Sequence, residues 1–168
     1  MVMMRQLKEG PVKVNSRRAP RTLTGPEVAD ARALALELVG MREAARIDAM
    51  VQGLVLEPDE VGRRVSALWL RIRVGGQWSP ASWSQVLISD HRLLVRLSGG
   101  ELVSLWWGSL VGFEVNLGEH FVILDFGDGR PRALSGPGVS LVAVAGVARL
   151  YGVGALTTHP ALEPLRAG

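Results

Sequence analysis

The stretch WSQVLISDHRLLVRL, residues 83–97, decides the fold of this chain. Two apolar runs flank the polar tetrapeptide SDHR at residues 89–92. Short apolar runs bounded by polar residues are typical of β-strands. Ser and Asp favour turns, because their side chains accept hydrogen bonds from nearby backbone amides. The stretch therefore predicts two paired strands joined by a turn.

The triplet Ser89, Asp90 and His91 also has the residue types of a hydrolytic triad. Catalytic triads bring together side chains that are distant in sequence, whereas three consecutive residues of an extended segment or turn point in different directions. The chain has no G-x-S-x-G elbow and no phosphate-binding glycine loop, and its three histidines are scattered. We therefore expect no catalytic residues, no metal site and no cofactor.

The composition suits one globular domain in the cytoplasm. The chain has 168 residues, and 48% of them are hydrophobic, which is enough for a sizeable core. The absence of cysteine excludes disulfides, thiolate zinc sites and thiol nucleophiles. No secretory signal is visible, and no apolar run approaches the roughly 18 residues that a membrane-spanning helix needs.

The positive charge is concentrated at the N-terminus. Residues 1–24 contain six basic residues and one acidic residue, and the remainder contains 13 basic and 15 acidic residues, for a formal net charge of +3. We expect residues 1–23 to be a flexible basic arm. The functional alternative is an arm that contacts nucleic acid through Arg17, Arg18 and Arg21.

Residues 24–53 are predicted to form a long N-terminal helix. Thr24 and Glu27 have the spacing of a capping box, and Pro26 suits a first turn. Small and apolar residues recur at helical spacing, although Gly40 could split the helix in two. We expect the apolar stripe to pack on the domain that follows, with a second copy or a partner helix as the alternative.

Beyond residue 62 the apolar period changes from about 3.6 to two, which indicates strands. The predicted strands are residues 66–74, 84–89, 92–97, 101–107, 110–117, 120–126 and 130–134. Residues 139–152 have the length and the glycine stop of a helix, and residues 153–168 are predicted to be a loose tail. The fold class is therefore α+β and mainly β, with about seven antiparallel strands in a bent sheet or small barrel that a C-terminal helix caps.

Residues 57–152 resemble the bacterial PH-like family, including its GRAM-like members. The features that match are the acidic lead-in LEPDEV, the hairpin and strand VLISDHRLLVRLSGGELVSLWW, the runs LVGFEVNL and HFVILDFGDG, and the terminal helix. Ser89 stands where the family usually has Thr. The resemblance implies a seven-stranded, strongly bent sheet capped by a helix, and a binding scaffold without a particular ligand.

Tryptophans and arginines supply the candidate binding surface. Trp69 shares its predicted strand face with Arg71 and Arg73, and such a face can bind anions, membranes or proteins. The alternative is a ladder of arginine stems over an outer tryptophan. Trp106 and Trp107 are adjacent, so in a regular strand one enters the core and the other faces outward. We expect the N-terminal helix to cover the outward one, with a partner or solvent as alternatives.

These observations predict a non-catalytic binding protein that engages a protein partner or a second copy of itself. Nucleic-acid binding through residues 1–24 and peripheral membrane binding are the alternatives, and no small-molecule substrate is indicated. PH domains that hold phosphoinositides use basic residues around the first strand pair, where Arg63, Arg64, Arg71 and Arg73 lie. However, the loop GGQWSPAS at residues 75–82 contains no basic residue, and the body of the chain is net negative. Strong binding to anionic lipid is therefore not expected.

Overall fold

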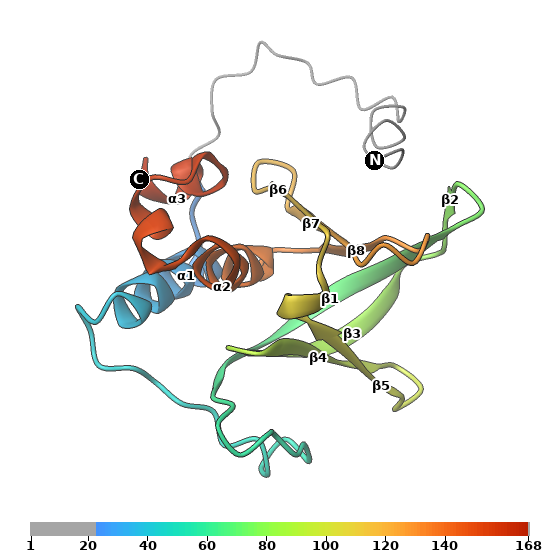
Figure 1. The fold of residues 1–168 in the computed structure, drawn as a ribbon, viewed down its shortest axis with the longest axis horizontal. Coiled ribbons are helices and arrows are strands. Elements are labelled where there is room, and N and C mark those ends of the chain that lie inside the picture. Colours follow the sequence, from blue (N-terminus) through green and yellow to red (C-terminus); the bar gives the residue numbers. More distant parts are fainter. Residues whose placement is uncertain (1–22, 168) are drawn as a thin grey trace.

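The computed structural model describes residues 23–167 and consists of a large antiparallel sheet with helices gathered at one end (Figure 1). The strands are β1 (Gly62–Val74), β2 (Gln77–Trp78), β3 (Ser82–Ser89), β4 (Arg92–Leu97), β5 (Leu102–Trp106), β6 (Gly112–Asn116), β7 (Phe121–Asp125) and β8 (Arg132–Ser135). The α-helices are α1 (Pro26–Leu38), α2 (Val139–Tyr151) and α3 (Glu163–Arg166). The prediction of a mainly β, α+β fold is confirmed.

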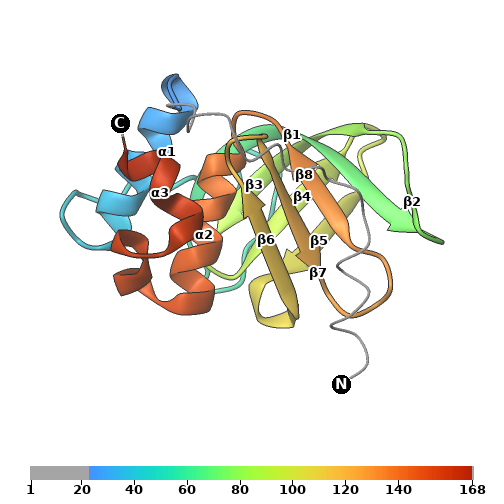
Figure 2. The same cartoon turned by 90° about the horizontal axis from the view of Figure 1, so that it is seen from above.

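The sheet is open, because its two end strands do not pair with each other. The strand order is β5-β4-β3-β1-β8-β7-β6, and β2 pairs with β1 outside this path. Strand β1 belongs to both halves of the sheet. It pairs with β3 from Gly62 to Leu70 and with β8 from Trp69 to Ile72, so it joins the two groups of strands (Figure 2).

The main core lies between the inner faces of the strands and α2. Alternate residues of the strands point inward and are fully buried, among them Leu68, Val86, Val122 and Leu134. All residues of α2 from Val139 to Val147 are buried, which is typical of a helix enclosed on every side. The close packing leaves no room for a side chain at Gly146, where a Cβ would lie 2.5 Å from Phe113.

Helix α1 is shorter than predicted. It ends at Leu38, and Gly40 follows with a φ of 79°, a left-handed conformation that glycine adopts at little cost. Its first turn contains Pro26 as predicted, but Gly25 occupies the N-cap and no side chain of the described chain caps it, so the capping box is wrong. The apolar stripe packs into the main core, as expected.

Residues 47–53 of the predicted helix instead belong to an irregular strap, residues 47–61, which lies against the outer face of β3 and β4. Strap and strands share a second core, made of Ala49, Leu54, Leu87 and Leu94. Arg92 donates to Glu60 at 2.8 Å, and Arg96 donates to the carbonyl of Gln52 at 2.9 Å. The long helix over residues 24–53 is therefore wrong beyond Leu38, because contacts with the sheet outweigh helical propensity there.

Residues 153–167 are not the loose tail that the sequence predicts. They form two short 3-10 turns, Val153–Thr157 and Pro160–Leu162, followed by α3. Leu156, Leu162 and Leu165 are buried in the main core. Arg32 on α1 donates to the carbonyl of Leu165 at 2.8 Å, so the C-terminal segment is tied to the first helix.

Candidate functional site

The SDH triplet forms the turn between β3 and β4, as predicted. Ser89 Oγ accepts a hydrogen bond from the amide of Arg92 at 2.9 Å and donates to the carbonyl of the same residue at 3.0 Å. Asp90 Oδ1 accepts from the amide of Val61 at 2.8 Å. His91 contacts Ser89 Oγ through its backbone amide, at 3.1 Å. The serine hydroxyl therefore stabilises the turn by bonding its backbone, and the three side chains do not assemble into a triad.

The candidate site is an aromatic–arginine face, formed by Trp69, Arg71, Arg73, Trp78 and Trp83. Alternation along β1 places Trp69, Arg71 and Arg73 on one side of the sheet. Trp83 on β3 lies directly opposite Trp69, and Trp78 on β2 lies directly opposite Arg73. Three strands therefore bring the five side chains to one face.

Two of the three tryptophans of this face are in contact with each other, and all three are open to solvent. The ring centroids of Trp69 and Trp83 are 4.8 Å apart, and the ring planes are inclined by 59°. Trp69 is 44%, Trp78 37% and Trp83 49% exposed. Tryptophan is usually one of the most buried residues, and grouped exposed aromatics mark interaction surfaces.

The arginines of the face carry uncompensated charge. Within residues 23–167, neither Arg71 nor Arg73 forms an ion pair, whereas Arg132 on the neighbouring β8 pairs with Asp128. The Arg73 guanidinium lies 6.0 Å from the ring centroid of Trp78, within reach of a cation–π interaction. The face is therefore both apolar and positively charged.

The face extends along a hairpin that projects from the body of the molecule (Figure 1). Gly75 and Gly76 form the turn between β1 and β2 with φ values of 58° and 79°. Two successive residues with positive φ are typical of a tight hairpin turn, and glycine adopts this conformation without steric cost. The projection leaves the end of β1 open to solvent, and Val74 there is 54% exposed.

Trp106 and Trp107 do not belong to this face. Trp107 enters the core, is 1% exposed, and donates from its indole Nε1 to the carbonyl of Ser89 at 3.0 Å. Trp106 is half-buried with the Arg92 guanidinium 4.4 Å from its ring centroid. The expectation that the N-terminal helix covers the outward tryptophan is wrong, because an arginine of the adjacent strand β4 does so.

Two arginines near the start of β1 are also separate from the face. Arg64 is buried and donates to Glu37 at 2.7 Å and to Asp30 at 2.9 Å. The hydrogen bond from Arg64 holds the pKa of Glu37 below its ordinary value, and it raises the pKa of Arg64. A register shift between Gly62 and Arg64 removes Arg63 from the alternation of the strand. These arginines therefore do not form one basic surface with Arg71 and Arg73.

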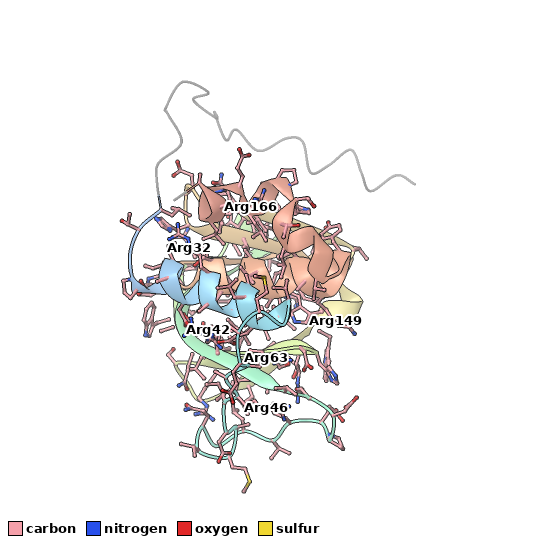
Figure 3. All side chains as sticks on the ribbon, turned by 90° about the vertical axis from the view of Figure 1, so that its left-hand side faces the viewer. Arg32, Arg42, Arg46, Arg63, Arg149 and Arg166 are labelled. Carbon is pink, nitrogen blue, oxygen red and sulfur yellow. The ribbon has the colours of Figure 1, made fainter. Side chains whose placement is uncertain are left out.

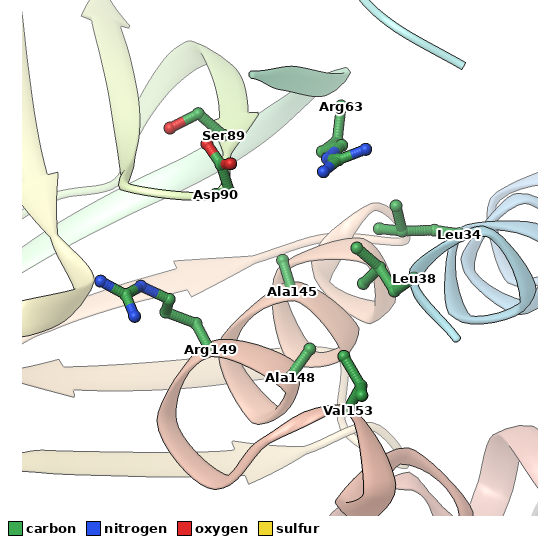
Figure 4. A pocket seen from close by; sticks show the side chains of 9 residues that line it. All are labelled: Leu34, Leu38, Arg63, Ser89, Asp90, Ala145, Ala148, Arg149 and Val153. Atoms are coloured by element: carbon green, nitrogen blue, oxygen red, sulfur yellow. The ribbon is translucent and has the colours of Figure 1, made fainter. Parts of the chain in front are cut away.

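Arg63 lines a small pocket between α1, α2 and the β3–β4 turn, with a volume of about 160 Å³ (Figure 4). Arg63 and Arg149 lie on different sides of it, and Ser89 and Asp90 close it toward the sheet. The remaining lining is apolar and consists of Leu34, Leu38, Ala145, Ala148 and Val153. The volume is below the roughly 300 Å³ at which small-molecule sites begin.

Sequence reasoning identified part of the aromatic–arginine face and missed Trp78 and Trp83. The sequence predicts a loop at Trp78 and a strand that begins one residue after Trp83. Their place on the face depends on the register of β1 with β2 and β3, which puts Trp78 opposite Arg73 and Trp83 opposite Trp69. Arg17, Arg18 and Arg21, the candidate nucleic-acid arm, lie outside the described residues.

The remaining findings concern metal sites, membrane-spanning helices and similarity to known proteins. Between residues 23 and 167 there is no group of three or more His, Asp or Glu side chains arranged to hold a metal ion. In the same part of the chain, no helix has the length and apolar character needed to cross a bilayer. No protein-family model matches the chain, and a comparison with curated proteins finds no significant match.

Proposed function

We propose that this chain is a non-catalytic binding protein with a PH-like architecture, which docks a protein partner through the aromatic–arginine face. Seven principal strands in an antiparallel sheet, with β1 shared by both halves, support the PH-like assignment. The helix α2, which follows the last strand and packs on the inner core, supports it as well. The fold supplies a scaffold, and the partner is argued from the face itself.

The observation that carries the proposal is the exposed pair of Trp69 and Trp83 beside two arginines that form no ion pair within residues 23–167. Tryptophan and arginine are the residues most enriched at the energetic centres of protein interfaces. Such a face is complementary to a partner that offers an apolar pocket for an indole and carboxylates beside it.

The charge on the face favours a different protein over a second copy. In a two-fold symmetric dimer built on this face, the same surface patch occurs on both subunits. Arg71 and Arg73 of both copies would then lie in one interface, and like charges brought into one interface weaken association. An acidic partner meets no such repulsion.

Quantitative affinity capture from cells of the source organism tests the proposal. The bait proteins are the full chain, the Trp69→Ala/Trp83→Ala double variant, and Tyr151→Ala as a control with an exposed aromatic residue outside the face. We expect one protein to be enriched by the full chain and by the control, and lost with the double variant. The purified pair should bind each other with the same dependence. Identical enrichment by all three baits would contradict the proposal.

A peripheral membrane role is the second candidate, because exposed tryptophans beside arginines on a projecting hairpin also suit a bilayer interface. Sedimentation with anionic vesicles distinguishes the two roles. Membrane binding predicts that the full chain sediments and Trp69→Ala/Trp83→Ala does not. The proposed protein-binding role predicts that both remain in the supernatant.

A further inference from the structure

A groove lies among α1, α2 and the C-terminal segment, and the aromatic–arginine face does not include any of its residues. Its volume is about 430 Å³, within the range of roughly 300–1,000 Å³ that is typical of small-molecule sites. The lining is Ala31, Arg32, Ala35, Leu36, Val39, Met41, Val144, Leu156, Thr157, Leu162, Leu165 and Arg166. All but three of these side chains are apolar, so the groove suits a hydrocarbon ligand.

Two of the three polar residues are arginines, and both lie on the helical side of the molecule (Figure 3). Arg32 donates from Nε to the carbonyl of Leu165 at 2.8 Å. Arg166 donates to the carbonyls of His159 at 3.0 Å and Leu156 at 3.3 Å. Neither arginine forms an ion pair within residues 23–167, so backbone carbonyls hold both guanidinium groups and leave their charge uncompensated.

Arg32 also has a donor without a partner. Its Nη2 atom is buried and forms no hydrogen bond within the described residues. A buried donor that is left unsatisfied costs free energy, and native proteins contain few of them. An anionic group in the groove would neutralise the Arg32 guanidinium, and a rotation of that side chain would let Nη2 donate to it.

We propose that this groove binds a medium-chain fatty acid, with the hydrocarbon chain along the apolar lining and the carboxylate at Arg32 and Arg166. A purely apolar ligand would leave both charges uncompensated. A nucleotide or sugar would bury many polar groups against a lining in which only Thr157 and the two arginines can bind them. A carboxylate is the planar anion that guanidinium groups bind best.

The first experiment compares three ligands on the full chain by isothermal titration calorimetry. Dodecanoate, kept below its critical micelle concentration, should bind saturably with one molecule per chain. Dodecan-1-ol, which has the same chain without the charge, should bind about tenfold more weakly. Butyrate, which has the charge with little hydrocarbon, should show no measurable heat. Absence of saturable dodecanoate binding, or equal affinity for the alcohol, would overturn the proposal.

Variants then locate the site. Ala35→Phe fills the groove and should weaken dodecanoate binding at least about tenfold, whereas Ala29→Phe, on the exposed side of the same helix, should leave it unchanged. Thermal melting checks that both variants fold. Unchanged affinity in a folded Ala35→Phe protein would place the ligand elsewhere and overturn the proposal.

The arginine is tested separately, so the result does not depend on one variant folding. Arg32→Gln should weaken dodecanoate binding about tenfold and leave dodecan-1-ol binding unchanged. Arg71→Gln, which removes an arginine from the aromatic–arginine face, should affect neither ligand. An equal loss of both ligands in Arg32→Gln would show that the residue acts through the fold and not on the carboxylate, which would contradict the assignment.

Discussion

Strand β1 carries arginines at both of its ends, and the two environments differ. Near the start, Arg64 is buried and its guanidinium is bound by Glu37 and Asp30. Near the end, Arg71 is exposed and has no ion pair within residues 23–167. A buried charge requires partners, whereas an exposed charge does not. The first end therefore fastens α1 to the sheet, and the second end is available to another molecule.

The outer face of β3 shows the same difference in apolar side chains. Leu87 is 1% exposed, because the strap covers it together with Leu94. Trp83 lies on the same face and is 49% exposed, since nothing in the described chain covers it. The strap therefore covers the part of this outer face around Leu87 and leaves the part around Trp83 open. That contrast is the reason to interpret the uncovered tryptophans as a docking surface.

The largest expected effect comes from the buried arginine. Arg64→Ala leaves Glu37 buried without a cationic partner, and we expect a loss of about 3–5 kcal/mol in the free energy of unfolding. Arg71→Ala should change the same quantity by no more than about 0.5 kcal/mol. Urea unfolding of both variants measures the difference. Similar losses in the two proteins would remove the distinction between the two ends of β1.

The next effect compares the covered and uncovered side chains of β3. Leu87→Ala opens a cavity under the strap and should destabilise the protein by about 2–5 kcal/mol. Trp83→Ala removes a larger side chain, yet it should cost only about 1 kcal/mol because half of that side chain is already in water. Both values come from chemical denaturation. A larger loss of stability in Trp83→Ala than in Leu87→Ala would mean that the tryptophan pair stabilises the fold, which would contradict its role as an open surface.

The two ends of β1 should also differ in their response to acid. Because Arg64 lowers the pKa of Glu37 from its ordinary value of 4.5, the folded state binds fewer protons there than the unfolded state. This contribution to stability is present above pH 4.5 and is lost as the pH falls through the lowered pKa. Wild type should therefore be more stable than Glu37→Gln at pH 7, and the urea midpoints of the two proteins should converge as the pH falls below 4.5 and through the lowered pKa. Arg71→Ala should follow the wild-type pH profile, and a constant gap between wild type and Glu37→Gln would contradict the assignment.

The smallest effect concerns fluorescence and involves no loss of stability. Iodide should quench tryptophan emission more than caesium does, since the arginines attract anions to Trp69 and Trp83. In Arg71→Gln/Arg73→Gln the difference between the two quenchers should shrink. An unchanged difference would show that the charge lies away from the exposed indoles.

Most of the sheet was predictable, because strands that bury one face leave a periodic signal. The predicted strand 92–97 coincides with β4, and the turn at Ser89 is where the sequence places it. The strap was not predictable, because residues 47–53 continue the helical spacing of the preceding segment and the partners of the strap, Leu87 and Leu94, are distant in sequence. The C-terminal segment was missed for the same reason, since its three buried leucines depend on α1 and α2.

The candidate site was predictable only within one strand. Alternation was sufficient to group Trp69 with Arg71 and Arg73, but the register between strands was needed to add Trp78 and Trp83. Alternation also separated the two adjacent tryptophans correctly. Trp107 enters the core, and Trp106 is half-buried on the other side of the sheet beside Arg92.

The position of β1 in the sheet determines the order in which the fold can form. Its first partner, β3, follows closely in the chain, but Trp69 meets Ser135 only when the last strand is present. The bond from Arg32 to Leu165 joins residues 133 positions apart. Contacts between distant residues form late and slow folding. On the ribosome, β1 can therefore pair with β3 and bring Trp69 beside Trp83 early, whereas its pairing with β8 must wait until Ser135 has been synthesised.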